Sequence, residues 1–77
     1  MAVPAPSSEM IRTIKDLGRR VAEQRRARNY TQQHFADLAG VGRRFVSELE
    51  DGKATAEIGK VLQVLNALGL DLVVKDR

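Results

Sequence analysis

Cysteine is absent from this 77-residue chain, and histidine occurs only once, at His34. The absence of cysteine excludes disulfides, thiolate metal ligands and a cysteine nucleophile. A single histidine without cysteine does not supply a metal-ligand set, so we expect no bound metal. A chain without disulfides is compatible with a reducing compartment, and we expect a cytoplasmic location.

Long apolar runs are missing as well. No stretch approaches the roughly 18 residues of a membrane-spanning helix, so we expect no membrane partner. The first ten residues, MAVPAPSSEM, lack the charged and apolar regions of a secretory signal. The sequence also contains no glycine-rich phosphate loop, no paired acid site and no metal-ligand spacing. We therefore expect no enzyme, no catalytic residue and no cofactor.

The composition is that of one small globular domain. Charged residues make up 30% of the chain, hydrophobic residues make up 43%, and the formal net charge is +3. A chain of this length buries roughly 60% of its unfolded surface, which leaves little room for a deep cleft. The modest basic excess is compatible with a polyanionic partner such as nucleic acid.

The first third of the chain predicts a tail and one helix. Residues 1–12 begin with proline, alanine and serine, and we expect a flexible tail there, followed by a single domain over 13–77. Thr13 and Asp16 have the spacing of a capping box, which predicts a helix over 14–28. We interpret its arginines mainly as a solvated face, with phosphate or partner contact as the alternative. These arginines are Arg19, Arg20, Arg26 and Arg28.

The middle of the chain predicts two short helices, over 32–39 and 43–51. Thr31 is suited to cap the first of them, because its hydroxyl can accept from free N–H groups. Gly40 is suited to end it with a positive φ. A small residue, a glycine turn and then apolar residues at fixed spacing are fairly specific for a helix-turn-helix, in which two helices cross closely. The residues that form this pattern are Ala36, Gly40, Val41, Val46 and Leu49.

The last third predicts a helix over 56–68, capped by Thr55, and then a β-strand over 70–75. A lone strand cannot satisfy its own backbone groups, and the chain offers only residues 10–14 as a partner. We therefore expect a homodimer built through the strand, with a frayed tail that covers the core as the alternative. The apolar stripe of the helix is Ile58, Val61, Leu62, Leu65 and Leu68, and the strand face is Leu70, Leu72 and Val74.

Residues 31–52 resemble the phage-repressor-like helix-turn-helix family, the Cro/C1 or XRE type. The resemblance rests on Thr31-Gln32, Ala36, Gly40-Val41, Val46-Ser47, Leu49-Glu50 and Gly52-Lys53. With the flanking helices it covers about residues 17–70, and residues 55–72 resemble HipB-type antitoxins. It implies an all-α, four-to-five-helix lambda-repressor-like domain with a short C-terminal β-strand for dimerisation.

The resemblance also implies a DNA-binding set: Gln32, Gln33, Arg43, Arg44, Ser47, Lys53 and Arg25. Gln32 is expected at the DNA backbone, where a helix N-terminus favours phosphate. Either arginine of the Arg43–Arg44 pair can read a guanine, and the other can contact phosphate. Arg25 and Glu50 match an ion pair of similar repressors. The alternative is two unrelated surface charges, worth about 0–1 kcal/mol.

These features predict a sequence-specific repressor that binds a palindromic operator in double-stranded DNA as a homodimer. The resemblance further implies the antitoxin of a HipBA-type operon, which autoregulates that operon and binds a HipA-type kinase toxin. The alternative is a stand-alone regulator of phage-like or restriction-control type, without a toxin partner. A second alternative is an interaction module that has lost DNA binding, and the polar residues at the expected DNA-reading positions argue against it.

Overall fold

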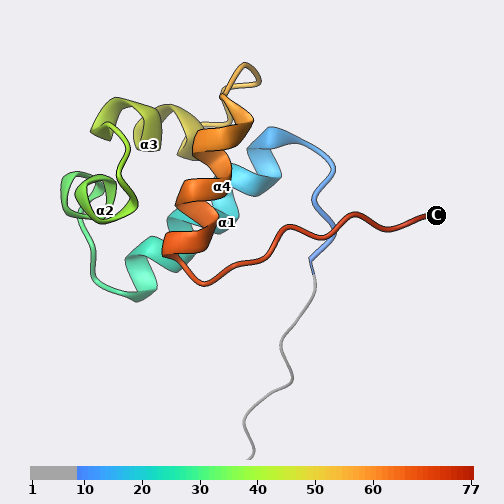
Figure 1. The fold of residues 1–77 in the computed structure, drawn as a ribbon, viewed down its shortest axis with the longest axis horizontal. Coiled ribbons are helices and arrows are strands. Elements are labelled where there is room, and N and C mark those ends of the chain that lie inside the picture. The colour runs from blue at the N-terminus through green and yellow to red at the C-terminus, as the bar shows by residue number, and fades with distance from the viewer. Residues whose placement is uncertain (1–8) are drawn as a thin grey trace, which may run out of the picture.

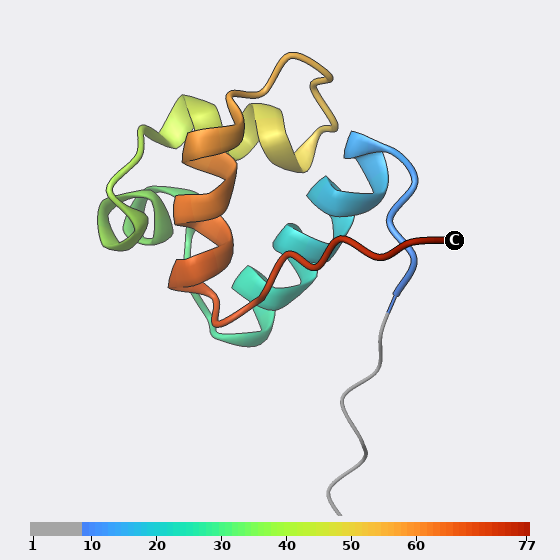
Figure 2. The ribbon, with the colours of Figure 1, turned by 45° about the vertical axis from the view of Figure 1, so that its right-hand side comes forward.

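The structure, a computed structural model, describes residues 9–77, and this part of the chain forms four helices. They are α1 (Ile14–Ala27), α2 (Gln32–Ala39), α3 (Arg43–Glu50) and α4 (Ile58–Ala67). α3 packs against both α1 and α2, and α4 closes the bundle against α2 (Figures 1 and 2). None of these helices has the length and apolar character needed to cross a membrane. The predicted helical fold is thus confirmed, with four helices in the described residues.

α1 begins with the predicted capping box. The Thr13 hydroxyl accepts from the Asp16 N–H at 3.1 Å, and the Asp16 carboxylate accepts from the Thr13 N–H at 3.3 Å. A backbone hydrogen bond from Arg12 is the main cause that lowers the pKa of Asp16. The helix ends at Ala27, one residue earlier than predicted.

α2 also has the predicted ends. The Thr31 hydroxyl accepts from the His34 N–H at 3.0 Å. At the other end Gly40 adopts φ +75° and ψ +29°, the left-handed conformation that glycine adopts at little cost. The turn at Gly40 lets the chain reverse and start α3 only three residues later.

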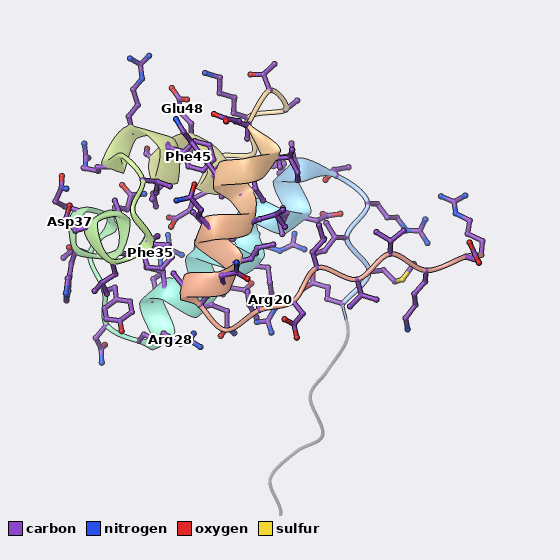
Figure 3. The ribbon with its side chains drawn as sticks, in the orientation of Figure 1. Arg20, Arg28, Phe35, Asp37, Phe45 and Glu48 are labelled. Atoms are coloured by element: carbon purple, nitrogen blue, oxygen red, sulfur yellow. The ribbon has the colours of Figure 1, made fainter. Side chains whose placement is uncertain are left out.

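The core lies where the helices meet and draws side chains from every one of them. Phe35 of α2 is fully buried, and Figure 3 shows it between α2 and α4. Ala36 is also fully buried, which agrees with the need for a small residue where α2 and α3 cross. The largest other buried side chains are Val21, Val46, Leu49, Val61, Val64 and Leu68.

The predicted start and inward face of α4 are partly wrong. The helix begins at Ile58 after Glu57, not after Thr55, because a turn closed by the Ala56 N–H on the Lys53 carbonyl (3.2 Å) delays it. Ile58 and Leu62 were expected inside, but their side chains are 62% and 40% exposed. Val64 is buried instead, so the buried face, Val61, Val64, Leu65 and Leu68, is rotated relative to the predicted stripe.

The predicted β-strand over 70–75 is wrong for the single chain, since residues 9–77 contain no strand. Leu70 donates its N–H to the Leu65 carbonyl and packs on the core, and no backbone hydrogen bond within the described chain involves residues 71–77. The physical reason is the lack of a paired neighbour. The segment runs past the stretch before α1 without forming a ladder with it (Figures 1 and 2). Leu72 and Val74 are left exposed.

The tail predicted over 1–12 falls mostly outside the described residues, and its flexibility stays a prediction. Within the described part, Glu9 contacts α1. Its carboxylate accepts from Arg19 at 3.0 Å and lies 3.9 Å from Arg20.

The packing of α1 on α3 depends on Gly18. This glycine is buried, and a Cβ at its position would collide with the backbone carbonyl oxygens of Leu49 and Glu50. Backbone atoms cannot rotate away as a side chain can, so any larger residue must push the two helices apart.

We predict that Gly18→Ala lowers the free energy of unfolding by about 1–3 kcal/mol, since it overpacks this contact. Gly59→Ala is the matched control. It also replaces a helical glycine, but its new methyl would lie 4.0 Å from the nearest side-chain atom, Glu57 Oε1. In the control, the free energy of unfolding should rise by up to about 1 kcal/mol, because alanine has a higher helix propensity than glycine. Urea unfolding followed by circular dichroism measures both, and equal effects would contradict the close-contact explanation.

Candidate DNA-binding surface

α3 is divided into a buried face and a charged outward face. Val46 and Leu49 are fully buried against the other helices. Arg43 and Arg44, in its first turn, are exposed, and Ser47 is half-buried one turn later. The helix therefore offers cationic and polar groups to a partner along one side while its other side is fixed in the core.

Arg44 and Lys53 meet at one carboxylate on this outward face. Arg44 Nε donates to Glu48 Oε1 and Lys53 Nζ donates to Glu48 Oε2, both at 2.9 Å. The hydrogen bond from Lys53, followed by that from Arg44, lowers the pKa of Glu48 and keeps it ionised. Figure 3 shows Glu48 beside Phe45 on α3, facing away from the core. The structure thus brings two predicted DNA-binding residues together through a third residue.

The two glutamines at the start of α2 have different surroundings. Gln32 is half-buried, and its Nε2 donates to Glu50 Oε1 at 3.1 Å. Gln33 is exposed, and its Nε2 donates to Asp37 Oδ1 at 3.0 Å, one turn along the same helix. Both side chains stand at the first turn of α2, where N–H groups and the helix dipole favour an anion such as phosphate.

Arg25 and Glu50 form a nearly buried ion pair. Arg25 Nε donates to Glu50 Oε2 at 2.7 Å, and Nη2 donates to Oε1 at 2.9 Å. Arg25 Nη1 also donates to the Tyr30 carbonyl at 2.7 Å. The hydrogen bond with Glu50 is the main cause that raises the pKa of Arg25. The two side chains are only 9% and 5% exposed, so this is not a chance meeting of surface charges.

The pair joins α1, α3 and the start of α2 at one point, because Glu50 holds both Arg25 and Gln32. A guanidinium that is 9% exposed offers little surface to a phosphate. We therefore interpret Arg25 as a residue that positions Gln32 and the end of α3. Direct contact of Arg25 with DNA stays a prediction.

Two contacts were missed from the sequence. Glu48 was not included in the site, although its i, i+4 spacing from Arg44 is the usual signal of a helical ion pair. Arg28 was expected on a solvated face, but its Nη2 donates to the Leu68 carbonyl at 2.7 Å, 40 positions along the chain. Figure 3 shows Arg28 below the end of α4. No local sequence pattern signals such a long-range contact.

The arrangement of α2, the Gly40 turn and α3 agrees with what comparison with known proteins finds. A family model described as a helix-turn-helix domain covers residues 16–77. The chain belongs to the helix-turn-helix family. The domain is XRE-like, and its presence makes this chain a transcriptional regulator with a DNA-binding domain.

A relative of similar sequence supports the assignment of this chain to the helix-turn-helix transcriptional regulators. The HTH-type transcriptional regulator y4mF of Sinorhizobium fredii is 48% identical over 65 residues, which is 84% of this chain and 86% of the relative. Among solved structures, HipB in a HipA-HipB-O2-O3 complex matches with a TM-score of 0.81 at 19% identity. That match covers 90% of this chain and 97% of HipB. A likeness at that identity concerns the fold alone.

A second type of solved structure is also similar to this helix-turn-helix protein. The restriction-modification controller protein C.AhdI from Aeromonas hydrophila matches with a TM-score of 0.67 at 28% identity. The match covers 75% of this chain and 84% of the controller. The fold is therefore similar both to HipB and to a restriction-modification controller protein.

We predict that Glu50→Ala lowers the free energy of unfolding by about 3 kcal/mol, because it leaves the Arg25 guanidinium nearly buried and without its carboxylate. Glu23→Ala is the matched control, since Glu23 contacts Arg19 and Arg20 on the exposed side of α1. The control should cost no more than about 1 kcal/mol. Urea unfolding measures both variants, and a similar small loss in both would show that the buried pair adds no more than a surface pair.

Proposed function

We propose that this protein is a sequence-specific repressor that inserts α3 into the major groove of double-stranded DNA. The observation that carries this proposal is the outward face of α3, on which Arg43 and Arg44 stand exposed while the opposite face is fixed in the core. A major groove admits an α-helix, and arginine can bond O6 and N7 of guanine together. The Ser47 hydroxyl, one turn further along, can donate to an acceptor of a base or accept from a base amino group.

Phosphate contacts would hold the helix in register. Gln32 and Gln33 at the start of α2 and Lys53 after α3 are suited to this role, since such contacts give affinity and orientation without reading sequence. Arg43 can do the same at the mouth of the groove. The net charge of +3 is compatible with such a polyanionic partner.

A second copy of the chain is the proposed dimer partner. The side chains of Leu72, Val73 and Val74 are 51%, 66% and 91% exposed, and their segment forms no backbone hydrogen bond with any of residues 9–77. Covering these side chains with the same segment of a second copy would remove apolar surface from water. A twofold dimer would place its two copies of α3 in successive major grooves, about 34–36 Å apart, on a palindromic operator.

We further propose that the protein is an antitoxin that represses its own operon and binds a HipA-type kinase toxin. The support is the fold match to HipB over 90% of this chain, in a structure that also contains HipA. The second candidate is a regulator without a toxin, and the likeness to C.AhdI favours it. Both candidates share the DNA-binding surface described above and differ only in the partner.

Replacing Arg43 and Arg44 together with alanine should weaken binding to a duplex selected from a random pool by more than about 30-fold. The helical content should not change, because the Arg44 side chain is 91% exposed. Arg19→Ala/Arg20→Ala removes the same charge from α1 and is the control. Fluorescence anisotropy gives the affinities. Unchanged affinity in the α3 variant, or an equal loss in the control, would contradict the assignment of α3.

Leu72→Ser/Val74→Ser should raise the dimer dissociation constant at least about tenfold, because it removes buried apolar surface from the proposed interface. Lys75→Ser/Asp76→Ser is the control, since it changes the same segment and also leaves the net charge unaltered. Sedimentation equilibrium measures the association. A dimer that is equally stable in both variants would show that the C-terminal segment is not the interface.

The antitoxin proposal predicts a kinase-like open reading frame next to the gene for this chain. Co-expression of the two proteins should give one complex on size exclusion, with both chains identified by mass. If no kinase-like open reading frame lies nearby, or if the two proteins elute separately, the result favours the second candidate, a regulator without a toxin. DNA binding is measured separately and does not depend on this result.

A further inference from the structure

A carboxylate lies on the face that we assign to DNA. Glu48 is one turn beyond Arg44 on α3, and an anion at that place repels phosphates unless cations offset it. Both of its oxygens are occupied, Oε1 by Arg44 Nε and Oε2 by Lys53 Nζ, each at 2.9 Å. The charge is therefore compensated within the surface, and the three side chains act as one cluster.

The cluster determines which edge of the Arg44 guanidinium is available. Glu48 binds Nε, and within the described chain no protein group accepts from Nη1 or Nη2 of Arg44. These two nitrogens carry the N–H groups that can face the paired acceptors O6 and N7 of guanine. An arginine already held at Nε loses less rotamer freedom when it binds than an arginine that is free in solvent.

Arg43, the neighbouring arginine, lacks this support. It is exposed, and among residues 9–77 no carboxylate forms an ion pair with it. A cation that no carboxylate holds in place is suited to bind a phosphate, a contact that tolerates variation in geometry. The two adjacent arginines thus differ in whether a carboxylate holds the guanidinium in a fixed direction, which base reading requires.

We propose that Glu48 is a positioning residue that makes Arg44 the guanine-reading arginine and leaves Arg43 and Lys53 to the phosphate backbone. This inference rests on the proposed function, sequence-specific binding through α3. The roles of the two arginines follow from their different contacts. The base assigned to Arg44 is guanine, because guanine presents the paired acceptors O6 and N7.

The test uses the full chain and a duplex selected by the wild-type protein from a random pool. Each guanine of the selected site is replaced in turn, and affinity is measured for every duplex over a range of salt concentrations. The proteins are the wild type, Arg43→Ala, Arg44→Ala, Glu48→Ala and the double variant Arg44→Ala/Glu48→Ala. Glu23→Ala, which changes the net charge by the same amount as Glu48→Ala, is the control, and circular dichroism checks that each protein is folded.

We expect Arg44→Ala to lose the preference for one guanine and Glu48→Ala to reduce the preference for that same guanine about tenfold. In the Arg44→Ala background, removal of Glu48 should change this preference no further. Arg43→Ala should weaken all duplexes alike and reduce the salt slope by about one. Glu23→Ala should keep the preference. Simple charge repulsion acts on every duplex equally, so its removal in Glu48→Ala would raise all affinities and keep the preference for that guanine. A loss of this preference, even with a general gain in affinity, therefore supports positioning.

Three results would overturn the proposal. Glu48→Ala could keep the guanine preference, which would make the contact with Arg44 irrelevant to reading. The preference could be lost in Arg43→Ala instead of Arg44→Ala. A further loss in the Arg44→Ala background, at a cytosine, would mean that Glu48 reads a base itself. If the wild type selects no sequence at all, the proposed function fails first and this inference fails with it, so the two failures are distinguishable.

Discussion

The ion pair between Arg25 and Glu50 is the constraint on which the DNA-binding surface depends. A charge removed from water is costly unless a partner and further hydrogen bonds compensate it. Here Glu50 accepts from Arg25 twice and from Gln32 once, and Arg25 also donates to the Tyr30 carbonyl. Every buried side-chain nitrogen and oxygen in the described residues has a partner. One carboxylate therefore sets the position of α3 relative to α1 and to the start of α2.

The close contact at Gly18 makes this ion pair possible. Because Gly18 has no side chain, the backbone of α1 can approach the last turn of α3, and Glu50 lies in that turn. The end of α3 is therefore fixed twice, by backbone packing and by the ion pair. In its first turn, Val46 is fully buried, whereas Arg43 and Arg44 stand in solvent. A helix that has one face fixed in the core and the other face exposed is suited to enter a groove without disturbing the core.

Local patterns predicted this fold where local chemistry decides it. The capping box at Thr13, the cap at Thr31 and the left-handed Gly40 all depend on residues a few positions apart, and all three were predicted. The start of α4 and the exposure of Ile58 were not, because they depend on how a turn and a distant helix meet. The strand over 70–75 failed for a related reason, since alternation predicts a strand only where a neighbour exists. In the candidate site, the residue types were visible in the sequence, but the contact that distinguishes Arg44 from Arg43 was not.

Glu48 and Glu50 show how one short helix can assign opposite roles to the same residue type. In an α-helix two positions differ by about 200° around the axis, so the two carboxylates point to nearly opposite sides. Glu50 faces α1 and is 5% exposed, and it serves the fold by holding Arg25. Glu48 faces outward and is 32% exposed, and it holds Arg44 and Lys53 where a partner can reach them. Because the Arg25–Glu50 pair fixes the orientation of α3, the Arg44 side chain that Glu48 holds points in a defined direction. A base-reading arginine needs that direction and a phosphate contact does not.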